Sequence, residues 1–461
     1  MLFSSAIFIV WFLPLFIIAY LLAPYRFKNA VALAGSFLFY VWGAPIFYLI
    51  LLVSASIDYF LSKRMASQTS QWPLVVGIGM NVATLFVFKY FNFFIDNART
   101  IVTGLGMNFP IIAEIALPLG ISFFTFQKIS YLIDVRRNEC LPAKNIFDYY
   151  LFVFLFPQLI AGPIVRYKEL ESQIKDRRDQ DNAAFKLGGF QRFALGLAKK
   201  VLIADTLATV ADQAFSNTEL GVFSSILGLM AYAFQIYYDF SGYTDMAIGL
   251  GMLMGFRFPE NFNWPYLAHG FRDFWRRWHI TLSTWMRDYL YHPLGGNRGT
   301  HAQVIRNLWI VFLLSGLWHG ASWNFVIWGV WHGLFITIDR YTRFFSRMPQ
   351  VPAALLTFAL VCFGWIWFRA PDLFSAMDYY ERIFSFETNA SIEVSSRQWF
   401  ILIIATVFAF LPAGTHQWVR SFHGDNQKAV LLKTTVAVAF LVLCLGQIAI
   451  SESQPFIYFR F

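Results

Sequence analysis

The chain has 461 residues, of which 57% are hydrophobic and 14% charged, and its formal net charge is +9. A soluble protein carries about 25% charged residues, so the composition excludes a soluble globular enzyme. Excess Lys and Arg in a polytopic membrane protein lies in cytoplasmic loops and beside anionic lipid, so the charge does not indicate nucleic acid. The three cysteines form no CxxC, which excludes a disulfide framework and a cysteine metal site.

Apolar stretches long enough to cross a bilayer recur along the whole chain. We predict an all-α polytopic membrane protein with about eleven transmembrane helices plus re-entrant or interfacial helices, in a single membrane domain that covers residues 1–461. The N-terminus lacks a basic n-region and a cleavage site, so we expect it to be retained as the first span. The expected spans and broken segments are 4–23, 30–61, 73–96, 110–134, 147–166, 188–215, 221–255, 305–318, 322–339, 352–369, 398–413 and 430–450.

Helix-breaking residues interrupt several of these segments. The segment 30–61 is expected to break at Pro45, and 147–166, with two prolines, is expected to be broken or re-entrant. The polar run "YYDFSGYTD" is expected to break 221–255. Its two aspartates, Asp239 and Asp245, suit either a proton path or ion site, or a helix break whose polar groups are satisfied.

Basic residues beside the spans predict an orientation. They gather after the first span and through the region 167–200, which includes an amphipathic helix. Loops rich in Lys and Arg stay in the cytoplasm, so we expect both regions to face the cytoplasm and the N-terminus to face outside.

The stretch 256–300 is dense in aromatic and basic residues. Within it, 269–299 predicts one helix with an aromatic face, ended by Pro293 and two glycines. A second stripe on that helix combines cation, imidazole and hydroxyl groups: Arg276, His279, Ser283 and Arg287.

Two interpretations of this stretch stay open. It is an interfacial helix with Trp at the headgroups and Arg on lipid phosphates, or it is a site for an anionic ligand held by Arg. Because His279 lies between arginines in the sequence, we expect its pKa to be lowered.

The stretch "LLSGLWHGASWNFVIWGVWHG" contains Trp-His-Gly twice. As one straight helix, the apolar run from Leu308 to Ile338 would be about 46 Å long, against a hydrocarbon core of about 30 Å. It must therefore break, and its small residues, Gly316, Gly320 and Ser322, are the natural place for the break.

His319 then lies at a helix end, and His332 lies about three turns into the next helix. The two rings would not share a face, and neither HExxH nor an intervening carboxylate is present, so we expect no metal site. Intramembrane ionisable residues are functional by default, and His319 is the better candidate. His332 is either a buried histidine bonded to a neighbouring helix or a residue that lines the site.

Other catalytic motifs are missing from the sequence. It contains no GxSxG elbow, no GxxxxGK[ST] phosphate loop and no GxGxxG after a strand. A covalent serine hydrolase or a nucleotide-driven pump would carry one of them.

Several long motifs resemble the membrane-bound O-acyltransferase family, within it the bacterial alginate O-acetylation branch that acetylates exported polysaccharides. The resemblance covers nearly the whole chain. Its markers are "MLFSS", "LPLGISFFTFQKISYLIDV", "FPQLIAGPIVRYKEL", "YDFSGYTDMAIGLGMLMGFRFPENFNWPY", "FWRRWHITLSTWMRDYLYHPLGGNRG", "GLWHGASWNFVIWGVWHG" and "PFIYFRF".

The resemblance implies helices around a central tunnel, with His319 and His279 as catalytic residues. It implies a cytoplasmic thioester donor, acetyl-CoA, with no permanently bound cofactor. The acetyl group then crosses the bacterial inner membrane to a periplasmic or extracellular serine-type acetyltransferase and on to a polysaccharide. The residues expected to bind the donor or line the tunnel are Arg276, Ser283, Arg287, Trp318, Asn324, His332, Asp239 and Asp245.

Two alternatives stay open. The first is acylation of cellulose, peptidoglycan, a lipid or a secreted protein by a member of the same family. The second is a transporter of acyl donors or sugar units, against which the lack of internal repeats argues.

Overall fold

The computed structural model describes residues 3–67, 70–385, 390–411, 427–450 and 454–459. In these residues every named element is a helix, as predicted. The chain divides into two compact units, residues 12–180 and residues 2–11 with 181–461.

The first unit consists of helices, with a long non-helical connection between α5 and α6. Its elements are α1 (Leu13–Leu22), η2 (Tyr25–Phe27), α2 (Lys28–Gly43), α3 (Tyr48–Ser67), α4 (Trp72–Leu85), η3 (Phe86–Tyr90), α5 (Phe91–Gly104), α6 (Ile121–Arg136), α7 (Ile146–Phe154), α8 (Phe156–Leu159) and α9 (Tyr167–Lys175).

The second unit contains all the predicted site residues. Its elements are α10 (Ala183–Ala198), η4 (Lys199–Ala204), α11 (Asp205–Ser216), α12 (Val222–Leu253), η5 (Pro265–Leu267), α13 (Phe271–Arg277), α14 (Ile280–Met286), η6 (Arg287–Tyr291), α15 (His301–His319), α16 (Trp323–Thr342), η7 (Phe345–Arg347), α17 (Gln350–Arg369), α18 (Leu373–Phe384), α19 (Ser396–Phe410), α21 (Gln427–Ile450) and η8 (Ile457–Phe459). A short π-helix, η1 (Ile7–Phe12), precedes α1 at the boundary between the units.

Among the described residues, three helical stretches are long and apolar enough to cross a membrane: Trp72–Gly104, Gln350–Arg369 and Gln427–Ile450. Ile7–Leu22 and Ser396–Phe410 are shorter apolar helices. The predicted count of about eleven spans stays a prediction. The last two residues of the predicted span 398–413 lie outside the described residues.

Two predicted breaks are confirmed. The first separates α2 from α3 around Pro45, and the second separates α7 from α8 at Leu155.

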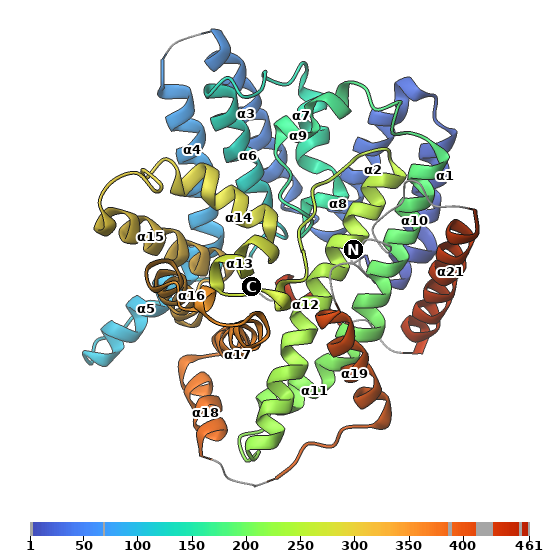
Figure 1. The fold of residues 1–461 in the computed structure, drawn as a ribbon. Coiled ribbons are helices and arrows are strands. Elements are labelled where there is room, and N and C mark those ends of the chain that lie inside the picture. The colour runs from blue at the N-terminus through green and yellow to red at the C-terminus, as the bar shows by residue number, and fades with distance from the viewer. Residues whose placement is uncertain (1–2, 68–69, 386–389, 412–426, 451–453, 460–461) are drawn as a thin grey trace. The chain divides into compact units, whose positions relative to one another are not determined.

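The predicted break in 221–255 is wrong, because α12 is one continuous helix. Its glycines serve close packing against α10, and the two helices run side by side in Figure 1. A Cβ on Gly242 would lie 2.7 Å from the carbonyl oxygen of Gly196, and one on Gly249 would lie 2.6 Å from that of Gly189. Since these glycines let two backbones touch, they do not mark a turn.

The predicted helix 110–134 begins too early. Residues 107–118 are not helical, and α6 starts only after Gly120, whose φ of 78° is in the left-handed region. A Cβ at that position would also lie 2.8 Å from the carbonyl oxygen of Leu159. The turn therefore needs glycine on both grounds, and the helix cannot extend back through it.

A charged pair is buried in the first unit, between α3, α4 and α6. The Nζ atom of Lys128 lies 3.4 Å from Oδ2 of Asp58 and donates a hydrogen bond to Ser54. The side-chain amide of Asn81 donates to both oxygens of the Asp58 carboxylate. Because each charge has a partner, the pair can stay ionised away from water.

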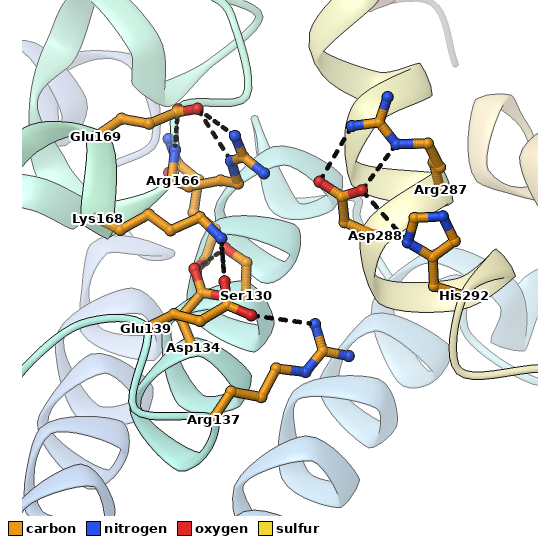
Figure 2. Close-up of polar contacts among 11 residues, drawn as sticks. Ser130, Asp134, Arg137, Glu139, Arg166, Lys168, Glu169, Arg287, Asp288 and His292 are labelled. Atoms are coloured by element: carbon orange, nitrogen blue, oxygen red, sulfur yellow. Dashed lines mark hydrogen bonds and ion pairs between the residues drawn. The ribbon is translucent and has the colours of Figure 1, made fainter.

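Ionic contacts also gather where α6 ends and α9 begins in the first unit (Figure 2). Lys168 pairs with Asp134 and Glu139, and Arg166 pairs with Glu169 at the start of α9. The Lys168 ammonium lowers the pKa of the Glu139 carboxyl by a hydrogen bond. Lys168 and Glu169 belong to the region 167–200, which the sequence predicts to face the cytoplasm.

Candidate functional site

His319 is the last residue of α15, as the length of the apolar run predicted. The chain then takes an extended conformation at Gly320 and begins α16 after Ser322. The side chain is 3% exposed. The break therefore places an imidazole at a helix end inside the second unit.

Two glycines let α15 and α16 cross closely beside this break. A Cβ on Gly316 would lie 2.2 Å from the carbonyl oxygen of Phe325, and one on Gly329 would lie 2.5 Å from that of Phe312. Real Cβ atoms do not approach so closely. These glycines consequently fix how α16 returns past His319.

His279 lies between two short helices, and the single helix predicted over this region is wrong. The helix α13 ends at Arg277, α14 begins at Ile280, and His279 has φ 41° and ψ 56°. Its neighbour Ile280 donates its backbone N–H to the carbonyl oxygen of Asn261 instead of to an intrahelical acceptor. A non-glycine residue with positive φ is strained and persists only where surrounding contacts hold it.

The side chain of Asn261 provides those contacts. Its Oδ1 atom accepts hydrogen bonds from the backbone N–H and the hydroxyl of Thr281, and it lies 3.0 Å from Nδ1 of His279. An oxygen that accepts from a backbone N–H must also be the acceptor for His279, so Nδ1 of that ring carries the hydrogen. In the neutral ring Nε2 is then a hydrogen-bond acceptor.

His279 lies outside the three stretches that could cross a membrane, and its side chain is fully buried. This burial lowers the pKa of the imidazole. The direction agrees with the sequence prediction, but the cause is burial and not the neighbouring arginines. Among the described residues Nε2 has no hydrogen-bond partner. His279 therefore presents a neutral ring with a defined acceptor nitrogen.

Aromatic side chains join the two histidines into what we call the histidine cluster: His279, Trp318, His319 and Tyr458. The centroid of the Trp318 ring lies 6.0 Å from that of His279 and 4.9 Å from that of His319. The ring of Tyr458 lies 5.6 Å from that of His319 and 6.4 Å from that of His279. Four buried rings with imidazole, indole and phenol groups thus share one small region.

Asp239 holds the segment that carries Tyr458. Its Oδ2 atom accepts the backbone N–H of Ile457 at 2.8 Å, and its Oδ1 lies 2.8 Å from Nζ of Lys200. Lys200 also pairs with Asp205 at 2.7 Å. Asp239 is therefore a buried anchor for residues 454–459, and it lies inside the continuous helix α12, not at a helix break.

His332 lies on α16 as expected, but its ring sits among aromatic side chains. Its ring centroid is 4.6 Å from that of Trp328 and 5.2 Å from that of Trp275. In the described part of the chain neither ring nitrogen has a hydrogen-bond partner, so the predicted bond to a neighbouring helix is not found. The ring centroid of Trp328 also lies 4.9 Å from that of His319. His332 therefore packs on a ring that itself packs on the histidine cluster.

The cationic stripe predicted beside His279 does not face the cluster. Arg276 is exposed, and Arg287 is exposed and pairs with Asp288 (Figure 2). Ser283 is half-buried, and its hydroxyl contacts the carbonyl oxygen of Trp278. Because the helix breaks at His279, the spacing no longer aligns these residues with the imidazole.

Two further predicted residues have structural partners. Asn324 donates its side-chain amide to the carbonyl oxygen of Ala370, which ties the start of α16 to the end of α17. Asp245 pairs with Arg192 and Lys199 of the second unit. Neither joins the histidine cluster.

Sequence reasoning did not assign a role to Tyr458 or Asn261. Tyr458 belongs to the motif "PFIYFRF", which served only as a marker of the family resemblance. The last two residues of this motif, 460 and 461, lie outside the described residues. Asn261 lies in "FPENFNWPY", whose polar residues gave no spacing signal. Only tertiary contacts bring these residues to the histidines.

The arrangement suits proton transfer in a water-poor region. Imidazole is the commonest general base, and aromatic walls limit the access of water to a reactive intermediate. Two neutral imidazoles and a phenol provide groups that can accept or donate a proton.

Residues 119–370 match the family model described as MBOAT, the membrane-bound O-acyltransferase family. The chain is 42% identical to the "Probable alginate O-acetylase AlgI" of Azotobacter vinelandii, over 92% of this chain and 86% of that protein. It is 44% identical to the protein of the same name from Pseudomonas aeruginosa, over 84% of this chain and 76% of that protein. The "Peptidoglycan O-acetyltransferase" of Helicobacter pylori is 39% identical, over 82% and 78%.

Proposed function

Because the chain belongs to the membrane-bound O-acyltransferase family and is an acyltransferase, we propose that it is an O-acetyltransferase that transfers acetyl across the membrane. The donor is a cytoplasmic thioester, acetyl-CoA, and the final acceptor is an exported polysaccharide such as alginate. Relatives named as alginate O-acetylases support this acceptor. The relative named as a peptidoglycan O-acetyltransferase supports peptidoglycan as the second candidate.

The observation that carries the proposal is the position of His319. It is a buried imidazole at a helix end, its ring lies 5.6 Å from that of Tyr458, and the ring of Trp318 joins it to His279. A thioester is reactive enough to be attacked by a hydroxyl that a base activates, so such a group is what the reaction needs.

In the proposed reaction His319 takes the proton of the acceptor hydroxyl. The oxygen attacks the thioester carbonyl, and the C–S bond breaks as the new C–O ester bond forms. The imidazolium returns its proton to the leaving thiolate, so the ring ends neutral. General acid–base catalysis of this kind contributes about 10²- to 10⁴-fold to the rate.

His279 positions the acceptor in this proposal. The single hydrogen of the attacking hydroxyl goes to His319, so Nε2 of His279 accepts a hydrogen bond from a second donor group of the acceptor, while Asn261 fixes the ring through Nδ1. A fixed tautomer keeps the acceptor nitrogen directed at one place. The strained backbone at His279 supports this role, because strain persists where function requires it.

The exposed cations Arg276 and Arg287 are candidates for the phosphates of the donor. We further propose a multi-pass protein of the bacterial inner membrane with about eleven spans. A periplasmic or extracellular serine-type acetyltransferase would complete the transfer to the polymer, so that this chain needs no serine nucleophile.

Membrane vesicles that contain the protein test the proposal. They receive acetyl-CoA with a radiolabelled acetyl group, a polymer acceptor and the candidate partner, and the label in the polymer is measured. We expect labelled alginate with the wild type and background label with His319→Ala at equal protein abundance. Label in peptidoglycan fragments instead would favour the second candidate, and transfer only from another donor would contradict acetyl-CoA.

A further inference from the structure

A cavity lies in the second unit beside α10, α12, α19 and α21, with a volume of about 560 Å³. Its walls are mostly aliphatic and aromatic; they include Leu195, Leu202, Phe400, Ile404 and Phe440. Side chains of α12 that line it, such as Tyr238, are distinct from Phe240, which packs on His279. The cavity is therefore separate from the histidine cluster and is large enough for a small-molecule ligand.

One part of the wall is charged. Arg192 donates to Asp245 at 2.8 Å and to Glu260 at 2.7 Å, and Lys199 donates to Asp245 at 2.6 Å. All four side chains line the cavity. Lys433 also lines the cavity, so three cations and two carboxylates stand beside an apolar space. They match a ligand with an apolar chain and a headgroup that carries both signs of charge.

The other side of the cavity reaches the surface of the apolar helices α19 and α21. The lining residues Phe400, Phe408 and Val436 are 61%, 53% and 40% exposed. The candidate span Gln427–Ile450 is only 11% buried, so its surface faces lipid in a membrane. What enters the cavity from this side is consequently a component of the bilayer.

We propose that this cavity binds a phospholipid with a zwitterionic headgroup, such as phosphatidylethanolamine. One acyl chain lies along the apolar walls, and the phosphate and ammonium meet Arg192, Lys199, Asp245 and Glu260. An unfilled apolar space of this size would cost free energy, and an acyl chain removes that cost. Asn261 also lines the cavity, so the bound lipid touches the same side chain that holds His279.

Photolabelling tests this site in the full-length protein. The probe is a phosphatidylethanolamine with a diazirine in its acyl chain, incorporated into membranes before irradiation and peptide mapping. We expect label on peptides of α10 and α12 inside the cavity, and competition by excess unlabelled phosphatidylethanolamine. Label confined to the outer surfaces of α19 and α21 would overturn the proposal, because it indicates only lipid around the protein.

Two neighbouring substitutions provide a matched pair. Ile404 lines the cavity, whereas Ile403 is 60% exposed on the same helix and does not. We expect I404W to reduce labelling of α10 and α12 about tenfold or more, and I403W to leave it near the wild-type level. Equal labelling in both variants would overturn the site.

The headgroup is tested with a diacylglycerol that carries the same diazirine chain. Recognition by the charged wall predicts about tenfold weaker labelling of α10 and α12 by this probe than by the phospholipid. Equal labelling by the two probes would contradict the assignment of the charged wall as a headgroup site. The competition experiment needs no variant, so the proposal stays falsifiable if I404W fails to fold.

Discussion

The rings of His319 and Tyr458 lie 5.6 Å apart, although the two residues belong to distant parts of the sequence. Tyr458 also contacts the ring of Phe240 at 4.3 Å, so it is held between α12 and the end of α15. This relationship adds a hydroxyl group to the two histidines and makes the segment 454–459 part of the site.

Replacing Tyr458 with Phe keeps the ring and removes only the hydroxyl. We propose that this hydroxyl exchanges a proton with His319, so we expect acetyl transfer to fall about 10²-fold, with normal abundance of the protein. The measurement is the O-acetyl content of the exported polymer. Tyr243→Phe is the matched control, since Tyr243 stacks on Phe456 of the same segment and also loses one buried hydroxyl; an equal loss in both variants would assign the effect to packing.

Asn261→Leu removes the acceptor shared by His279 and Thr281. Buried donors without a partner cost about 1 to 3 kcal/mol each, and the His279 ring loses its fixed tautomer. We expect a lower unfolding temperature in detergent together with reduced acetylation. Asn261→Asp keeps an acceptor oxygen and should recover part of the unfolding temperature and part of the acetylation. Equal values of both in the Asp and Leu variants would show that the hydrogen bonds to Oδ1 do not stabilise the site.

Asp239→Ala removes the anchor of residues 454–459 and one of the two carboxylates that Lys200 contacts. Breaking a buried pair costs about 3 to 5 kcal/mol. We expect reduced abundance and loss of acetylation. Asp239→Asn keeps an acceptor for the N–H of Ile457, so it should retain more activity than Ala. Limited proteolysis reports whether the segment is released, and unchanged cleavage in the Ala variant would argue against an anchor.

Gly316→Ala places a methyl group 2.2 Å from the carbonyl oxygen of Phe325. Overpacking of this kind costs about 1 to 3 kcal/mol, so α15 and α16 should separate and the protein should unfold at a lower temperature. Gly79→Ala is the control, because a Cβ there meets nothing within 4 Å. Equal unfolding temperatures for the two variants would show that the crossing tolerates the methyl group.

The sequence predicted the elements whose causes are local. Length against bilayer thickness located the break at His319, and proline located the break between α2 and α3. It mispredicted α12, because the polar run that suggested a break stays helical and its Gly242 packs against the backbone of α10. The spacing of residues within one segment does not predict which distant segment will pack against it.

The same limit explains the site. Periodicity aligned Arg276, His279 and Arg287 on one helix, but the backbone turns at His279, where His279 and Thr281 donate hydrogen bonds to Asn261, and this turn separates the three residues. Tyr458 reaches the histidines because Asp239 binds the backbone of Ile457, an interaction that no local pattern signals. The sequence therefore identified the two histidines as candidate site residues, but it did not identify the residues that contact them.

The most direct test of the account is His319→Ala, with the O-acetyl content of the exported polymer measured beside the abundance of the protein in the membrane. The account predicts that acetylation falls by about 10²-fold or more while abundance stays at the wild-type level, because the base is lost and the fold is kept. His332→Ala is the parallel control, and we expect it to lower stability more than it lowers the rate per folded molecule. Normal acetylation by His319→Ala at normal abundance would contradict the central claim.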